Sequence, residues 1–197
     1  MLNYVLPAAA FALVTAQAAF ACEDRVTIDP MQARELLSTI ANDGADPLDQ
    51  FFAFDTLMCA DQTGIRDLAL RTGAASSNAT IQGQVLMRSL FEMETIAVKL
   101  LPAEGLSTEH YKAIEQNPQL NFAVRYRDLA AGCLSFGSDR GCDRNSNLSV
   151  TGTKAILHID HNDDIIGSFS VVDGGLMGDV RVDALNGLVF PAQIELF

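Results

Sequence analysis

The spacing of hydrophobic residues changes near residue 119. Before that point, apolar side chains recur three or four positions apart, as on one face of a helix. After it, they alternate with polar side chains, as on a half-buried strand, and turn dipeptides separate the runs. The pattern predicts an α+β protein, with a helical region of about four helices over residues 22–119. Residues 120–197 are predicted to form an antiparallel β-meander or sandwich packed with those helices.

Local signals place several of the helices. Asp29-Pro30 and Asp46-Pro47 each combine a capping carboxylate with proline at the first helical position, which is typical of a helix start. Two further helical segments, beginning at Ile65 and Ile81, share the spacing of their Ile and Leu residues, and we expect them to pack as a pair. Residues 108–116 predict one more short helix, which Asn117-Pro118 closes.

The second part of the chain predicts about six short strands. The clearest alternation of buried and exposed positions is in residues 122–126, 155–159, 180–184 and 192–196. Asn186-Gly187 is a typical hairpin turn, because both residues tolerate positive φ. Residues 95–101 fit either a strand or the end of a helix. No linker rich in Ser, Gly or Pro separates the two regions, so we expect one shared core.

The first twenty-one residues predict an export signal. Met1–Ala21 has no charged side chain, contains an apolar run, and ends in the small-x-small sequence Ala19-Phe20-Ala21. Cleavage before Cys22 would deliver a periplasmic or secreted protein. A transmembrane anchor is the competing interpretation, but the run is short and contains Pro7. A lipid on Cys22 is another alternative, which the bulky Phe20 and the even number of cysteines disfavour.

Composition restricts the class of partner. With 49% hydrophobic and 19% charged residues, the chain has the composition of an ordered globular protein. Its formal net charge of −12 would repel nucleic acids and anionic membrane surfaces. We therefore expect no nucleic-acid binding and no membrane span after removal of the signal, which leaves an unknown protein or surface partner.

The four cysteines are expected to form structural disulfides, since an exported chain meets an oxidising compartment. Cys22, Cys59, Cys133 and Cys142 allow three pairings, and the sequence alone does not choose among them. Proximity favours Cys133 with Cys142, which bracket a turn-rich loop, and leaves Cys22 with Cys59.

One polar segment is a candidate metal site. On a strand, His158 and Asp160 point to the same face, and imidazole with carboxylate is a common start to a zinc or iron site. With His161 they form a His-x-Asp-His string, which resembles part of the metal motif of metallo-β-lactamase-type hydrolases over four residues. Ile156 stands where that motif has a further histidine. The alternative is a polar hairpin tip, because Asn and Asp are typical of turns.

Two loops also place oxygen side chains at alternate positions, as calcium loops do: 143–147 and 160–164. Neither has the glycine or the final glutamate of an EF-hand. A polar loop beside a disulfide is the competing interpretation.

The chain lacks a Gly-x-Ser-x-Gly motif and a phosphate-binding glycine loop, and we expect no cofactor. The hypothesis that follows is a periplasmic or secreted binding module that is not an enzyme. One alternative is a metal-dependent hydrolase that uses the His158-x-Asp160-His161 segment, with either His161 or Asp164 as the third ligand. Another is an acidic inhibitor or immunity-type protein with a basic target, for which the exposed Asp179 and Asp183 would provide the binding face.

Overall fold

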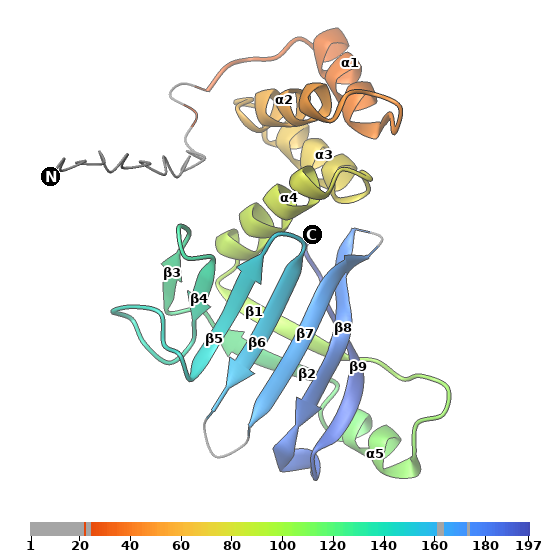
Figure 1. Cartoon of the computed structure of the whole chain (residues 1–197), viewed down its shortest axis with the longest axis vertical. Helices are drawn as coiled ribbons and strands as arrows, with labels where there is room; N and C mark the ends of the chain where they lie inside the picture. The colour runs from red at the N-terminus through yellow and green to blue at the C-terminus, as the bar shows by residue number, and fades with distance from the viewer. Residues whose placement is uncertain (1–21, 23–24, 161–163, 173) are drawn as a thin grey trace, which may run out of the picture.

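The computed structural model describes residues 22, 25–160, 164–172 and 174–197, and it confirms the α+β fold (Figure 1). Within these residues there are five α-helices and nine β-strands. The helices are α1 (Pro30–Ala41), α2 (Pro47–Met58), α3 (Thr63–Ala74), α4 (Ala79–Glu92) and α5 (Thr108–Gln116). The strands are β1 (Thr95–Leu100), β2 (Gln119–Ala123), β3 (Tyr126–Asp128), β4 (Cys133–Ser135), β5 (Ser146–Thr151), β6 (Lys154–Ile159), β7 (Ile165–Val172), β8 (Gly175–Val182) and β9 (Leu188–Ile194).

The predicted helix starts are confirmed, and their caps explain them. Asp29 accepts a hydrogen bond from the backbone N–H of Met31 at 2.8 Å, and Asp46 accepts one from Leu48 at 2.8 Å. Each carboxylate thereby satisfies a backbone donor that the first helical turn leaves without a partner. The short helix α5 covers Thr108–Gln116, as the sequence predicts.

Helices α1 to α4 form a helical cluster around fully buried side chains that include Ile40, Leu57 and Ile81. The disulfide Cys22–Cys59 ties the start of the described chain to the end of α2. The two segments with matching Ile and Leu spacing become α3 and α4, which contact each other as expected.

All nine strands belong to one antiparallel sheet in the order β2-β1-β9-β8-β7-β6-β5-β4-β3. Only Val124 and Arg125 separate the two end strands, β2 and β3, along the chain. A flat sheet of nine strands would be about 38 Å wide at a spacing of about 4.8 Å. Because two linking residues span about 10 Å at most, the sheet has to curl until its two ends approach each other. The predicted β-meander or sandwich is therefore one curled antiparallel sheet.

The predicted alternation is confirmed where the strands are long. Ala155, Leu157 and Ile159 of β6 are buried, and so are Val180 and Val182 of β8. Asn186 has φ 57° and Gly187 has φ 67°, so the predicted turn does adopt the left-handed region, directly after a 3-10 turn at Asp183–Leu185. Residues 95–101, left open between helix and strand, contain β1, which belongs to the sheet although it precedes residue 119.

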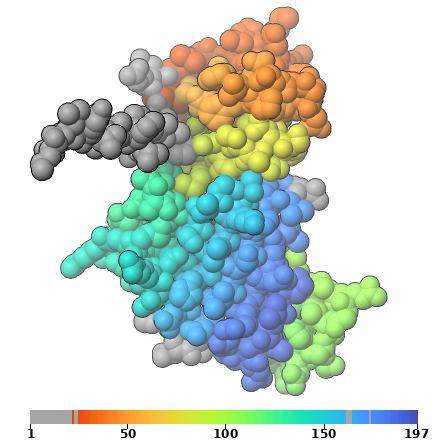
Figure 2. Space-filling model, viewed as in Figure 1, coloured from red at the N-terminus to blue at the C-terminus, as the bar shows by residue number. Residues whose placement is uncertain are grey.

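The buried apolar side chains form two clusters, which helix α4 joins. Ile81 and Val85 pack in the helical cluster, whereas Leu86 and Leu90 pack in the cluster inside the curled sheet. The space-filling view shows the helices lying directly on the end of the sheet (Figure 2). Gly83 of α4 packs against the backbone at Gly152, where an added β-carbon would lie 3.2 Å from the carbonyl oxygen. Helix α4 therefore fixes the position of the helical cluster relative to the sheet.

Candidate functional site

The sequence-predicted metal residues lie around the hairpin between β6 and β7. His158 of β6 is half-buried, and its Nδ1 lies 3.1 Å from the carbonyl oxygen of Arg144, so the Nδ1–H donates to that carbonyl. Asp160 is exposed, and its backbone N–H donates to the carbonyl of Asn145 at 2.6 Å. His161 lies outside the described residues. His158 and Asp160 thus hold the segment at Arg144 and Asn145, directly after the disulfide loop, beside β6.

The third histidine lies in a different part of the fold. His110 is on α5, where its ring packs edge-on against Phe190 of β9 at 5.2 Å and its Nδ1 lies 2.7 Å from Oγ of Ser107. Among the described residues, no group of three or more His, Cys, Asp and Glu side chains is arranged to hold a metal ion. The structure does not bring His110 and His158 together in such a group.

The calcium-like segment 143–147 uses its side chains to build a turn. Oδ1 of Asp143 accepts from the N–H of Asn145 at 3.0 Å, and Nδ2 of Asn147 donates to the carbonyl of Asp143 at 2.6 Å. The disulfide Cys133–Cys142 closes the loop directly before this segment, and Cys22–Cys59 is the second bridge. The pairing that proximity favours is therefore the pairing in the structure.

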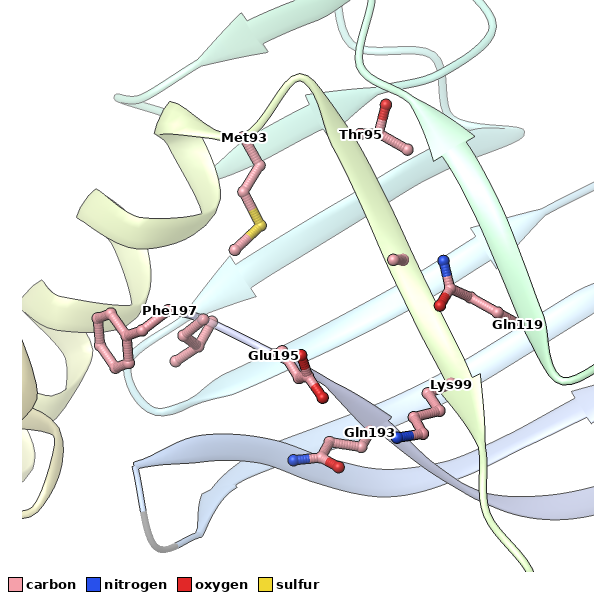
Figure 3. Close-up of a pocket in the computed structure, with 9 residues that line it drawn as sticks. Met93, Thr95, Lys99, Gln119, Gln193, Glu195 and Phe197 are labelled. Atoms are coloured by element: carbon pink, nitrogen blue, oxygen red, sulfur yellow. The ribbon is translucent and has the colours of Figure 1, made fainter.

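A second feature, which the sequence did not predict, lies on the outer face of the sheet where the chain leaves β9. Strand β1 pairs with β9 only from Val98↔Ile194 to Leu100↔Ala192. Beyond Ile194 the chain diverges from β1 and runs toward α4, which opens a space between them (Figure 3). We call this space the wedge. It measures about 510 Å³ and is lined by Met93, Thr95, Ala97, Lys99, Gln119, Gln193, Glu195, Leu196 and Phe197.

Figure 3 shows how the side chains are distributed in the wedge. It is narrowest at Lys99 and Gln193, which are direct cross-strand partners, and it widens toward Met93 and Phe197. Lys99 is also the cross-strand partner of Gln119 on β2, so a polar row crosses three strands. Successive residues of a strand face opposite sides of the sheet, which explains why these side chains face outward while Val98 and Ile194 are buried.

Two further cavities of about 360 Å³ each adjoin the wedge at Leu196 and Phe197. One reaches the loop at Gly174 and Gly175, and the other lies along α3 and α4, beside Asp67 and Glu92. All three share the last two residues, and in Figure 1 the chain end lies between the helices and the sheet. We call the wedge and these two cavities together the C-terminal groove.

Contacts of the last two residues fix one wall of the C-terminal groove. Leu196 is only 6% exposed and packs in the sheet cluster, whereas Phe197 is 45% exposed with the guanidinium of Arg71 5.5 Å from its ring centre. The last residues are thereby anchored on one side and open to solvent on the other.

Arg127 fixes the wall at the end of α4. Its Nε donates to the carbonyl of Phe91 at 2.9 Å, and its Nη2 donates to the carbonyl of Met93. A cation on these last carbonyls favours the helix end that presents Met93 to the wedge.

One charged group of α4 is held inside the helical cluster rather than in the groove. Burial lowers the pKa of Arg88, and the carboxylates of Asp55 and Glu92 oppose that shift. Its Nη2 lies 3.4 Å from Oδ1 of Asp55, and its guanidinium lies over the ring of Phe54 at 5.8 Å. These contacts join α4 to α2 and so stabilise the helical wall of the groove.

Within the described residues, no helix is long and apolar enough to cross a membrane. No family model, curated protein or solved structure matches this chain.

Proposed function

We propose that this chain is a periplasmic or secreted binding module, not an enzyme, and that its partner docks in the C-terminal groove. The observation that carries the proposal is the meeting of three cavities at Leu196 and Phe197, between the helices and the sheet. Ligand sites occur preferentially at such junctions between packed units.

The groove has the chemistry of a recognition surface. Gln119 and Gln193 carry amide groups that both donate and accept hydrogen bonds, and they flank the ammonium of Lys99. Phe197 and Met93 supply apolar contact at the wide end of the wedge. Phe197 is exposed on one side while Arg71 covers its ring, which is how an aromatic anchor of an interface is pre-ordered.

Export is the other half of the proposal. The uncharged leader with its small-x-small end supports it, and two disulfides fit an oxidising compartment. The mass of the protein recovered from exporting cells, measured without reductant, tests this half. A chain that begins at Cys22 with two bridges is expected, and a retained leader would contradict it.

Site-specific photo-crosslinking tests the groove. We would place p-benzoylphenylalanine at Gln119, on the rim of the wedge, in cells that export the chain. Ile156 on β6 and Leu48 on α2 are matched controls, because both are exposed and neither lines the groove. A discrete adduct from position 119 alone is expected. An adduct from position 48 or 156 alone would place the interface elsewhere and overturn the proposal.

A further inference from the structure

The geometry points to the kind of partner: an extended polypeptide segment that adds as a strand to β1 inside the wedge. This inference rests on the proposed function, since it specifies what occupies the C-terminal groove. It follows from the direction of the backbone groups of β1 rather than from its side chains.

Hydrogen bonds at the end of β1 establish which residues face which neighbour. The N–H of Leu100 donates to Pro118 at 3.0 Å, on the side of β2, and the N–H of Leu101 donates to Pro191 at 2.7 Å, on the side of β9. In an antiparallel ladder these directions alternate along the strand. The N–H and C=O groups of Thr95 and Ala97 therefore point away from β2 and toward the wedge.

Pairing on the two sides of β1 ends at different places. On the side of β2 it continues to Thr95↔Ala123, whereas on the side of β9 it stops at Val98↔Ile194. Continued pairing would set Glu195 opposite Ala97, but the chain has diverged there to bury Leu196 and to place Phe197 beside Arg71. The same contacts thus leave Thr95 and Ala97 of β1 without a strand partner on this side among the residues that the structure describes.

An open strand edge of this kind selects an extended backbone, because its donors and acceptors repeat at the spacing of a strand. The incoming segment would present apolar side chains to Met93 and Phe197 at the wide end of the wedge. Glu195 and Lys99 line the wedge, Asp67, Glu92 and Arg71 line the adjoining cavity, and the whole chain carries a net charge of −12, so acidic groups outnumber basic ones both locally and overall. These charges favour a segment with basic residues next to its apolar ones.

The test begins by selecting random dodecapeptides, displayed on phage, against the purified disulfide-bonded protein. The tightest peptide is then synthesised twice, unmodified and with every backbone nitrogen methylated, which keeps its side chains and charge but removes its N–H donors. Amide hydrogen exchange of the protein is measured by NMR with and without each peptide. We expect the unmodified peptide to slow exchange at Thr95 and Ala97, and methylation to weaken binding at least about tenfold.

The variant Ala97→Pro provides an independent measurement. By the alternation that the bonds of Leu100 and Leu101 establish, the N–H of Ala97 points away from β2, so proline removes a donor that faces the wedge without removing a bond to β2. Binding is expected to weaken by about tenfold as well. Because the methylated peptide is tested on the unmodified protein, the strand-addition proposal stays testable even if this variant unfolds.

The outcomes separate the two proposals. A peptide that perturbs Gln119, Gln193 and Phe197 but leaves exchange at Thr95 and Ala97 unchanged would overturn strand addition and leave the groove as a binding site. Equal binding of the methylated peptide would overturn it in the same way. If no selected peptide reaches the groove, strand addition is wrong, and the crosslinking experiment at Gln119 decides the proposed function by itself.

Discussion

Gly73 of α3 lies so close to Val85 of α4 that a β-carbon added to the glycine would be 2.9 Å from Cγ2 of the valine. The same β-carbon would be 2.8 Å from Ile81, which is fully buried. Side chains in real structures do not approach so closely, so only glycine lets the two helices pack at this distance. Because α4 also forms a wall of the C-terminal groove, this contact positions the groove as well.

Substitution at Gly73 tests that packing. We expect Gly73→Ala to lower the free energy of unfolding by about 1–3 kcal/mol, since the extra methyl group forces a packed interface apart. Gly64 lies on the same helix with no atom within 4 Å of its added β-carbon, so Gly64→Ala is the matched control. That change is expected to raise stability by up to about 1 kcal/mol through helix propensity. Urea denaturation of both variants measures the contrast, and equal effects would contradict it.

The last two residues are expected to differ in what they contribute. Leu196→Ala should lower the free energy of unfolding by about 2–5 kcal/mol, because the side chain is buried in the sheet cluster. Phe197→Ala should cost less than about 1 kcal/mol, the usual size of an exposed cation–π contact, but should abolish the crosslink from Gln119. Thermal melts and the crosslink yield report the two effects. If Phe197→Ala lowers stability but leaves the crosslink from position 119 intact, Phe197 is not part of the binding surface.

The free energy of unfolding that is lost on removing each disulfide is expected to increase with the length of the loop that the disulfide closes. The cysteines are 37 positions apart in Cys22–Cys59 and 9 apart in Cys133–Cys142. Loop entropy predicts losses of about 4 and about 2.5 kcal/mol respectively for the paired serine variants. Chemical denaturation of each double variant measures the losses. A larger loss for Cys133–Cys142 would mean that packing of its loop, rather than chain entropy, dominates.

Replacement of His158 tests the remaining metal hypothesis. We expect His158→Ala to lower the free energy of unfolding by about 1 kcal/mol, through the lost hydrogen bond to Arg144, and to leave the metal content unchanged. Native mass spectrometry before and after denaturation measures bound metal directly. A metal that the unmodified protein releases on denaturation, and that the variant lacks, would revive the hydrolase hypothesis.

Local signals in the sequence explain why most of the helices could be predicted. Asp29 and Asp46 cap helices by accepting hydrogen bonds from backbone N–H groups two positions later in the chain. Both partners therefore lie within one short stretch of sequence. The long strands could also be predicted, because hydrophobic and polar residues alternate along β6 and β8 over enough positions to show the period of a strand. The single strand predicted over residues 122–126 was wrong, because the chain leaves β2 after Ala123 and begins β3 at Tyr126, at the other end of the sheet. Strand β4 was missed because it has only three residues and all three are buried, which removes the alternation.

The candidate site depends on contacts that no local pattern encodes. Residues 192–196 have the pattern of a regular strand, yet the strand ends at Ile194, where the chain leaves β1 and brings Phe197 beside Arg71 of α3. The sequence contained only one indirect signal, the polar Gln193 and Glu195 at alternate positions, which indicates an outward face but not a groove. His158 shows the opposite case, in which the sequence suggested chemistry and the structure shows a hydrogen bond to a backbone carbonyl.

The pairing of β1 with β9 also constrains the order in which the molecule is made. Val98 pairs with Ile194, about 100 residues later in the chain, whereas β5 to β8 are consecutive hairpins that need no distant partner. Contacts between residues so far apart form late, because a long loop has to close first. If the chain is exported as an unfolded polypeptide, the hairpins from β5 to β8 can form as they emerge, but the seam beside β1 forms only once β9 has crossed. The partner's docking place would then exist only after β9 has emerged and paired with β1.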